Sequence, residues 1–117
     1  MGQFRFILWL AYWYLQSKSF RFEWDKGNAK KSAEKHGITQ EEVESVFTLN
    51  LAVPIGRQVS PKVDEERLCI VGPAVSGQLT SIVFTLREGK VRPISSRIAS
   101  RKERRLYEEI REALKNV

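Results

Sequence analysis

The sequence predicts a small α+β domain, in which an antiparallel sheet of three or four strands packs against two N-terminal helices and a C-terminal helix. A chain of 117 residues with 42% hydrophobic content suits one domain with one modest core. Between residues 51 and 98, short runs rich in β-branched and aromatic residues alternate with turn residues, which is typical of antiparallel strands. Capping residues and apolar residues at helical spacing indicate helices before and after this region.

The chain begins with an apolar segment, because residues 6–15, FILWLAYWYL, are all hydrophobic. A membrane-spanning helix needs roughly 18 or more such residues, so this run is too short. Its length suits the core of a signal peptide, but no cleavage site follows. The alternatives are an element packed on the domain, a weak membrane anchor, or residues upstream of the natural start. We favour the last and expect an extension over residues 1–19 and one domain over residues 20–117.

The first elements of the domain are predicted from alternation and from helix caps. Residues 20–24, FRFEW, alternate aromatic and charged side chains, which predicts a short strand. Asp25 is a good N-cap and Gly37 a good helix end, so a first helix is expected over residues 26–36. A threonine and a glutamate three positions apart form a capping box just after Gly37, which predicts a second helix over residues 40–47.

The strands of the sheet follow the second helix. Residues 51–55 form a short apolar run, but Pro54 has no backbone N–H, so we expect an edge strand there. Residues 56–64 are the clearest loop in the chain. Residues 79–86, LTSIVFTL, give the strongest strand signal because they are rich in β-branched and aromatic residues. Further strands are expected over residues 66–71 and 91–98.

The sequence leaves the register of the last hairpin open. A tight turn at Glu88-Gly89 would pair Arg87 with Lys90 and put both on one face of the sheet with Arg92. Arg97 would then lie on the other face. A one-residue bulge would instead bring Arg87 and Arg97 to the same face.

The net charge of +6 comes from one stretch of the chain. Residues 87–105 hold eight basic and two acidic side chains, and the other residues hold twelve of each. Several of these bases crowd the first turns of a C-terminal helix, which a capping box between Ser100 and Glu103 begins. Because a helix N-terminus already carries partial positive charge, this arrangement indicates an anionic, phosphate-rich ligand. The alternative is a solvated basic face.

One cysteine, Cys69, and one histidine, His36, limit the chemistry of the chain. They exclude an internal disulfide and metal sites built from several cysteines or histidines. The sequence has no glycine-rich phosphate loop and no nucleophile elbow, so nucleotide hydrolysis and cofactor redox chemistry have no local support. We therefore expect no cofactor and no metal. Cys69 lies in an apolar run and is interpreted as a small core residue.

A series of short motifs resembles the BrnT toxins of bacterial type II toxin–antitoxin systems. No single motif is specific for this family, but the set of motifs in this order is. The resemblance extends over residues 20–109. The motifs are FEWD at 22–25, KHG at 35–37, EEV at 41–43, VF at 46–47, EER at 65–67, VFTLR at 83–87 and ISSR-x-x-S-x-x-E-R-x-x-YE at 94–108.

The resemblance implies a RelE-like fold and a cytoplasmic endoribonuclease that cuts RNA without a metal, through attack by the 2′-hydroxyl. It also implies a BrnA-like antitoxin as partner, in a heterotetramer. The antitoxin's ribbon-helix-helix domain would bind operator DNA while its other end masks the toxin. Operator DNA would thus be reached only through the antitoxin, and no membrane would be involved.

The chain departs from the family pattern in the loop before residue 65. Relatives often carry Asp-x-x-His-Ser there, whereas this chain has Pro61 and Lys62 where His and Ser would fall. Further departures are Thr48-Leu49-Asn50 after VF, Pro93 within a strand, and Ser32 in the first helix. The alternative function is therefore a catalytically degenerate toxin homologue that acts only as an antitoxin-binding co-repressor. A nucleic-acid-binding domain unrelated to toxins is a more distant alternative.

Metal-free RNA cleavage requires a base, an acid, and groups that hold the extra negative charge on phosphorus. Arginine suits the last role because its planar fork binds two phosphate oxygens, and we expect Arg67 and Arg97 to act as phosphate clamps. Their alternative is an ion pair with a nearby glutamate. His36 titrates near neutral pH and is the expected acid or base, unless it only caps a helix. Glu66 is a second candidate base, with a salt bridge as its alternative.

The other basic residues are expected to bind the RNA backbone or an acidic antitoxin segment. We expect the cationic side chains of the last two strands and the final helix to converge on one pocket. Trp24 is interpreted as buried beside the first strand rather than as a base-stacking residue, and Tyr107 as a core residue. The proposed RNA-binding residues are Arg87, Arg92, Arg101, Lys102, Arg104 and Arg105.

Overall fold

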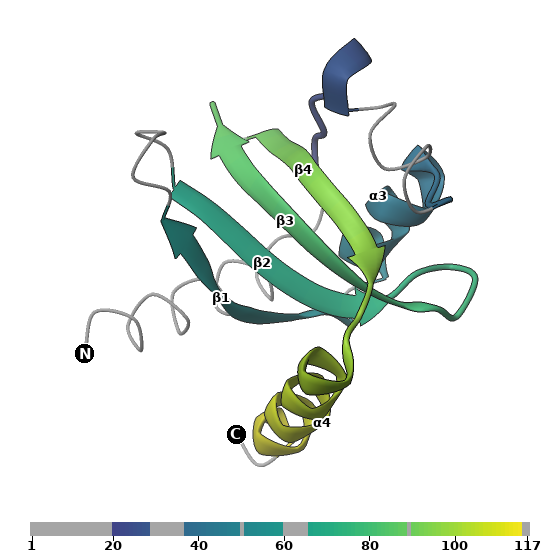
Figure 1. Ribbon diagram of the computed structural model, residues 1–117, viewed down its shortest axis with the longest axis vertical. Helices are drawn as coiled ribbons and strands as arrows, with labels where there is room; N and C mark the ends of the chain where they lie inside the picture. The colour runs from purple at the N-terminus through teal and green to yellow at the C-terminus, as the bar shows by residue number, and fades with distance from the viewer. Residues whose placement is uncertain (1–19, 29–36, 50, 60–65, 89, 116–117) are drawn as a thin grey trace.

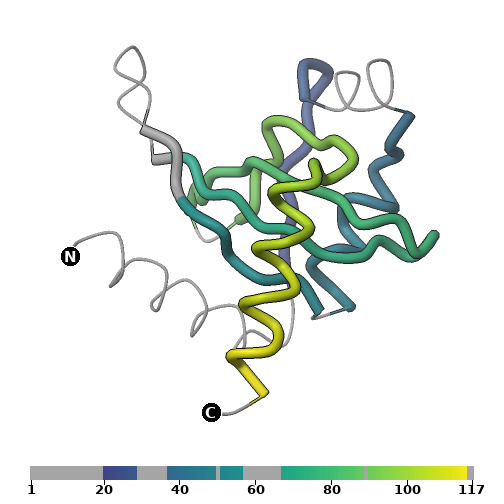
Figure 2. Tube along the Cα trace, turned by 60° about the horizontal axis from the view of Figure 1, so that its bottom comes forward, coloured from purple at the N-terminus to yellow at the C-terminus, as the bar shows by residue number. Residues whose placement is uncertain are grey.

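A computed structural model describes residues 20–28, 37–49, 51–59, 66–88 and 90–115. Its elements are α3 (Gln40–Thr48), β1 (Val53–Val59), β2 (Glu66–Pro73), β3 (Leu79–Arg87), β4 (Lys90–Ile98) and α4 (Arg101–Leu114). The strands form one four-stranded antiparallel sheet in the order β1-β2-β3-β4 (Figure 1). α3 lies on one side of this sheet, whereas α4 begins at the end of β4 and extends beyond the sheet (Figure 1 and Figure 2). The predicted α+β architecture is confirmed.

Residues 20–28 run along the outer edge of β4. Phe22 makes a single parallel bridge to Val91, with a backbone hydrogen bond on either side. The predicted strand over residues 20–24 is reduced to this bridge, because the chain turns helical at residues 26–28. The rest of the predicted first helix lies outside the described residues. None of the helices in the described ranges is long and apolar enough to span a membrane.

The second predicted helix is present as α3, but only the N-cap half of its capping box is seen. Thr39 is the N-cap, and its hydroxyl accepts a hydrogen bond from the backbone N–H of Glu42 at 3.2 Å. The prediction of a loop over residues 56–64 is wrong at its start, because residues 56–59 belong to β1. They pair with residues 66–69 of β2, and this ladder outweighs the local turn signal.

The core lies between α3 and one face of the sheet. Phe47 of α3 and Phe84 of β3 are fully buried, with ring centroids 5.1 Å apart and planes at 85°. Ile70 and Ile82 are paired across β2 and β3 and add to the same buried face. Because side chains alternate along each strand, the opposite face of these strands receives the polar residues between them.

Gly72 of β2 allows the link between α3 and β1 to pass close to the sheet. A Cβ atom at this position would lie 2.5 Å from both the Cα and the Cβ of Ala52. Only glycine therefore fits without moving the backbone.

The hairpin of β3 and β4 combines the two registers that the sequence left open. Arg87 pairs with Lys90, as a tight turn requires. Further along, β4 has one extra residue, Ile94, that faces no partner in the β3 ladder. This bulge shifts the alternation by one, so Arg97 shares a face of the sheet with Arg87 and Arg92. Of the two registers that the sequence left open, the one with a bulge is therefore present.

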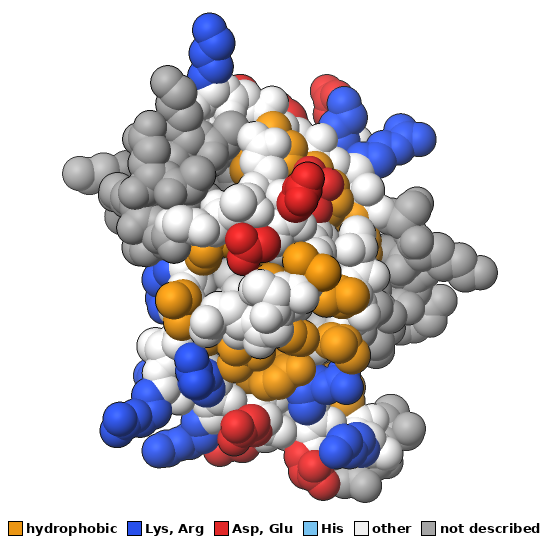
Figure 3. Space-filling model, turned by 90° about the vertical axis from the view of Figure 1, so that its right-hand side faces the viewer, with side chains coloured by type: hydrophobic (Ala, Val, Ile, Leu, Met, Phe, Trp, Pro, Cys, Tyr) orange, Lys and Arg blue, Asp and Glu red, His pale blue; other side chains and the backbone are white. Residues whose placement is uncertain are grey.

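One side of the molecule carries a group of exposed apolar side chains, which we call the apolar surface (Figure 3). The large apolar side chains that are exposed in the described residues are those of Leu49, Leu51, Val75 and Ile98, and Val75 is 69% and Ile98 50% exposed. The turn that carries Val75 rests on α3, because its backbone N–H donates to the Ser45 hydroxyl at 2.9 Å. The apolar surface thus lies where α3, the β2–β3 turn and the end of β4 meet.

Candidate functional site

A hollow of about 670 Å³ opens at the hairpin end of the sheet. One wall is the turn at residues 25–28, and the other is formed by β2, β3 and β4. The hollow is lined by Asp25, Lys26, Gly27, Asn28, Arg67, Arg87, Arg92, Pro93 and Ile94. Cations therefore outnumber acids around it, which favours an anionic ligand.

The register of the strands brings one arginine from each of three strands to this hollow. Thr85 of β3 pairs with Arg92 of β4, and Arg87 follows two residues later on the same face. The β2–β3 ladder, continued by one residue, places Arg67 beside Thr85. The convergence of these arginines is thus a consequence of cross-strand pairing, which holds their backbones rigidly.

Arg67 lines the hollow and also carries a buried hydrogen-bond donor. Its Nε is buried and has no hydrogen-bond partner among the described residues. A buried donor that bonds to nothing destabilises the folded protein by roughly 1–3 kcal/mol. At the hollow, the outer fork of the Arg67 guanidinium can match two oxygens of a phosphate.

Arg92 is held by two acids at the rim of the hollow. Its Nη2 donates to Oδ2 of Asp25 at 2.6 Å, and its Nη1 lies 3.6 Å from Oε1 of Glu23. The Arg92 side chain is 18% exposed, so these contacts are partly shielded from water. A hydrogen bond from the backbone N–H of Asn28, together with that from Arg92, holds the pKa of Asp25 below its ordinary value.

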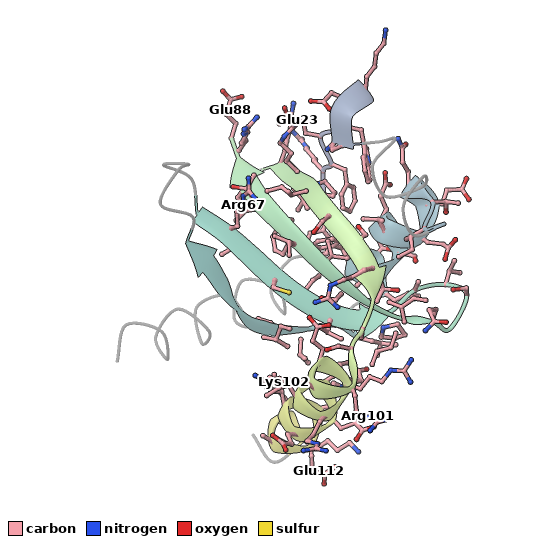
Figure 4. The ribbon with its side chains drawn as sticks, in the orientation of Figure 1. Glu23, Arg67, Glu88, Arg101, Lys102 and Glu112 are labelled. Carbon is pink, nitrogen blue, oxygen red and sulfur yellow. The ribbon has the colours of Figure 1, made fainter. Side chains whose placement is uncertain are left out.

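A second, smaller hollow of about 420 Å³ lies next to the first at the hairpin turn. It is lined by Glu23, Arg87, Glu88 and Lys90. Glu23, Arg67 and Glu88 all lie at this end of the sheet, whereas Arg101 and Lys102 lie at the other end (Figure 4). Arg87 lines both hollows and connects them.

Arg97 is not at the hollow and is bonded to an acid at the opposite end of the same face. Its Nη1 and Nη2 donate to the two carboxylate oxygens of Glu103 at 2.6 and 2.9 Å. The ion pair named above as the alternative for Arg97 is therefore present. Ser81, the partner of Arg97 in β3, lies six residues before Arg87, which corresponds to about 20 Å along the strand.

Glu103 is the centre of this bonded group. It is 9% exposed and also accepts hydrogen bonds from the Ser81 hydroxyl at 2.9 Å and the Ser100 N–H at 2.8 Å. Burial raises the pKa of Glu103, but the hydrogen bonds from Ser100, Arg97 and Ser81 outweigh it, so the pKa is lowered. This network ties the start of α4 to β3 and β4.

The bases of α4 form a separate cationic surface. Arg101, Lys102, Arg104 and Arg105 are all exposed at the start of the helix. The expectation that the cations of the last strands and the final helix converge on one pocket is therefore wrong. The sheet separates them, since α4 begins at the end of β4 that lies farthest from the hairpin turn.

The remaining predicted site residues have varied surroundings. His36 and the side chain of Glu66 lie outside the described residues. Trp24 is half-buried rather than fully buried, packs against the core, and donates from its Nε1 to Glu44 at 2.8 Å. Tyr107 is half-buried. Within the described ranges, no three His, Cys, Asp or Glu side chains come together as a metal site would require.

Cys69 is only half-buried and does not belong to the buried core, contrary to its interpretation from the sequence. It lies on the polar face, where Sγ is 3.5 Å from the Ser81 hydroxyl. Burial raises the pKa of its thiol.

The sequence did not identify Asp25, Lys26 and Asn28 as parts of a site. Asp25 was interpreted only as an N-cap, and no local signal links this turn to a strand 65 residues later. The connection is made by Asn28, whose Nδ2 donates to the carbonyl of Pro93 at 3.0 Å. Only the folded chain brings these segments together.

A family model described as ribonuclease toxin, BrnT, of type II toxin–antitoxin system matches residues 24–103. The matched range includes every residue that lines the larger hollow and ends at Glu103. No curated protein matches the chain.

Proposed function

The chain belongs to the BrnT family of ribonuclease toxins of type II toxin–antitoxin systems, and on this premise we propose that it is an endoribonuclease that cuts RNA without a metal ion. The observation that carries the proposal is the hollow at the hairpin end, where three arginines and one lysine surround a single acid. This excess of positive charge suits a phosphate with its neighbouring ribose.

In the proposed reaction, the ribose 2′-oxygen attacks the adjacent phosphorus and the bond to the 5′-oxygen breaks. The proton of the 2′-hydroxyl goes to a base, and an acid protonates the departing 5′-oxygen. Arg67 and Arg92 are suited to hold the non-bridging oxygens as negative charge develops on them. Both arginines line the hollow, which supports this assignment.

His36 and Glu66 remain the proposed acid and base. His36 is the only side chain in the sequence whose ordinary pKa lies near neutrality, and Glu66 precedes Arg67 in the chain. For Arg97, the bidentate bond to Glu103 supports a role in holding α4 rather than in clamping the phosphate of the substrate.

Cleavage of a defined RNA in excess EDTA tests the proposal. We expect products that end in a 2′,3′-cyclic phosphate or its hydrolysis product, because the 2′-hydroxyl is the nucleophile. An enzyme that leaves RNA intact in EDTA and cuts it when magnesium is restored would contradict the metal-free mechanism.

A second candidate is a degenerate toxin homologue that only binds antitoxin and represses its operon. It is favoured by one feature, the loop with Pro61 and Lys62 where relatives often carry His and Ser. A parent protein that cuts no RNA but still binds the antitoxin would support this alternative.

The partner expected for a toxin of this kind is an antitoxin, and we propose a BrnA-like protein with a ribbon-helix-helix domain that forms a heterotetramer with the toxin in the cytoplasm. The apolar surface supports such a partner. Removing large exposed side chains such as Val75 and Ile98 from water on binding is favourable. The neighbouring bases of α4 suit an acidic segment of the antitoxin. Operator DNA would be reached through the antitoxin alone.

A further inference from the structure

Asp25 uses its two carboxylate oxygens for different parts of the hollow. Oδ1 accepts hydrogen bonds from the backbone N–H groups of Gly27 and Asn28, at 2.9 and 3.0 Å. Oδ2 accepts the hydrogen bond from Nη2 of Arg92 at 2.6 Å. One oxygen therefore shapes the turn that forms one wall, and the other holds an arginine of the opposite wall.

The turn has a second anchor besides Asp25. Asn28 is 7% exposed, and its Nδ2 donates to the carbonyls of Glu23 and Pro93 at 3.0 Å each. Its Oδ1 accepts from the N–H of Asp25 at 2.7 Å. This buried amide anchors the turn to β4, so the neutral isostere Asn at position 25 should leave the wall in place.

Arg92 depends on Asp25 much more strongly. Its other acidic neighbour, Glu23, is 3.6 Å away, beyond the length of a good charge-assisted hydrogen bond. The guanidinium is planar and has five N–H donors, so fixing one nitrogen determines where the others point. Without the Asp25 carboxylate, the long side chain would sample several orientations at the rim.

We propose that Asp25 is a positioning residue that fixes the guanidinium of Arg92 at the wall of the hollow, so that its remaining N–H groups meet the phosphate of the bound RNA. This inference rests on the proposed function. In this role Asp25 acts through Arg92 and not on the reacting atoms.

The variant Asp25→Asn separates positioning from charge. It removes one negative charge beside the hollow, so RNA should bind as tightly as before or more tightly. The loss of orientation should nevertheless lower kcat by roughly 10- to 100-fold. If the role of Asp25 were purely electrostatic, the Asp25→Asn variant would have a lower KM and an unchanged kcat. If the role were purely structural, the variant would lose stability together with activity.

A double-mutant cycle tests whether Asp25 acts through Arg92. Asp25→Asn should have little further effect on kcat in a protein that already carries Arg92→Ala. Glu41→Gln is the matched control, because it makes the same change in charge at an exposed position on α3. An equal loss of kcat in both backgrounds, or an unchanged kcat in Asp25→Asn, overturns the inference.

Nuclear magnetic resonance of the arginine side chains gives a readout that does not need activity. We expect the guanidinium of Arg92 to rotate slowly in the parent protein, because it is bonded to Asp25. In Asp25→Asn it should rotate faster. Equal rotation rates in the two proteins overturn the inference. If the parent protein cuts no RNA, the proposed function fails, and the comparison of rotation rates still decides whether Asp25 holds Arg92.

Discussion

At the scale of single residues, the arginines differ in how much of each guanidinium is already bonded. Arg97 donates hydrogen bonds to Glu103 from two nitrogens, and Arg92 donates one to Asp25 from a single nitrogen. Arg67 keeps a buried Nε without a partner in the described part of the chain. Arg67 lines the hollow from β2, so we expect the proposed reaction to depend on its guanidinium.

Replacing Arg67 should therefore separate activity from stability. In Arg67→Met we expect cleavage to fall by roughly 100-fold or more, because one charged donor to the transition state is lost. The free energy of unfolding should be at least that of the parent, since the substitution removes a buried N–H without a partner. Initial rates of RNA cleavage and urea denaturation measure the two effects.

The control for this experiment is Arg111→Met, which makes the same chemical change on α4. Arg111 lies in the last turn of that helix, away from the hollow. Cleavage should stay within about twofold of the parent rate. An Arg67→Met protein that keeps its activity would remove Arg67 from the proposed site.

At the scale of elements, the junction between β4 and α4 is held by one buried carboxylate. Glu103 completes the capping box with Ser100 and accepts hydrogen bonds from Ser81 and Arg97. It thereby offsets the repulsion of the exposed bases that crowd the start of the helix. The position of the basic surface of α4 thus depends on Glu103.

Substituting Glu103 should reduce stability in a pH-dependent way. In Glu103→Gln we expect a loss of about 1–2 kcal/mol at pH 7, because charge-assisted hydrogen bonds become neutral ones. The folded-state pKa of Glu103 is lowered, so its contribution is complete above its ordinary value of 4.5 and disappears as the pH falls through the folded-state pKa. The difference between parent and variant should therefore shrink below pH 4.5.

Urea denaturation of both proteins between pH 3 and pH 7 measures this dependence. Glu109→Gln, at an exposed position of the same helix, is the control and should differ little from the parent at any pH. A difference for Glu103→Gln that stays constant down to the acid end of the range would show that its ionisation does not stabilise the junction.

At the scale of the whole molecule, two surfaces lie at opposite ends of one sheet. The hollow opens beside the β3–β4 turn, where Arg87 pairs with Lys90. The apolar surface lies at the other end, where Ile98 pairs with Thr80. A partner on the apolar surface therefore does not need to contact the hollow, and the binding of antitoxin and the cleavage of RNA should be separable by mutation.

Placing a charge on the apolar surface tests this separation. In Val75→Asp we expect antitoxin binding to weaken by about 10-fold or more, because burying an unpaired carboxylate in an interface is unfavourable. RNA cleavage by the free variant should be unchanged. Calorimetric titration with the antitoxin and the EDTA-resistant cleavage assay provide the two measurements.

Gln78→Asp adds the same charge to an exposed polar position near Val75 and serves as the control. It should bind antitoxin within about threefold of the parent. Equal weakening by both variants would point to long-range repulsion by the added charge rather than to contact with Val75.

Local signals in the sequence determined several of the elements of this protein. The capping boxes before residues 40 and 101 predicted the starts of α3 and α4, because each needs only side chains three positions apart. The run of β-branched residues predicted β3 for a similar reason. The motifs that resemble the BrnT family also follow one another in the chain, and the family match over residues 24–103 confirms the resemblance.

Only the tertiary structure decided which charged residues meet. The bulge at Ile94 brought Arg97 to the face of Arg87, yet the length of the strand kept the two apart. The hollow joins a turn at residues 25–28 to three strands, through bonds between residues far apart in sequence. Strand register and long-range hydrogen bonds depend on the packing of the whole chain, so no window of sequence contains the information that places these side chains together.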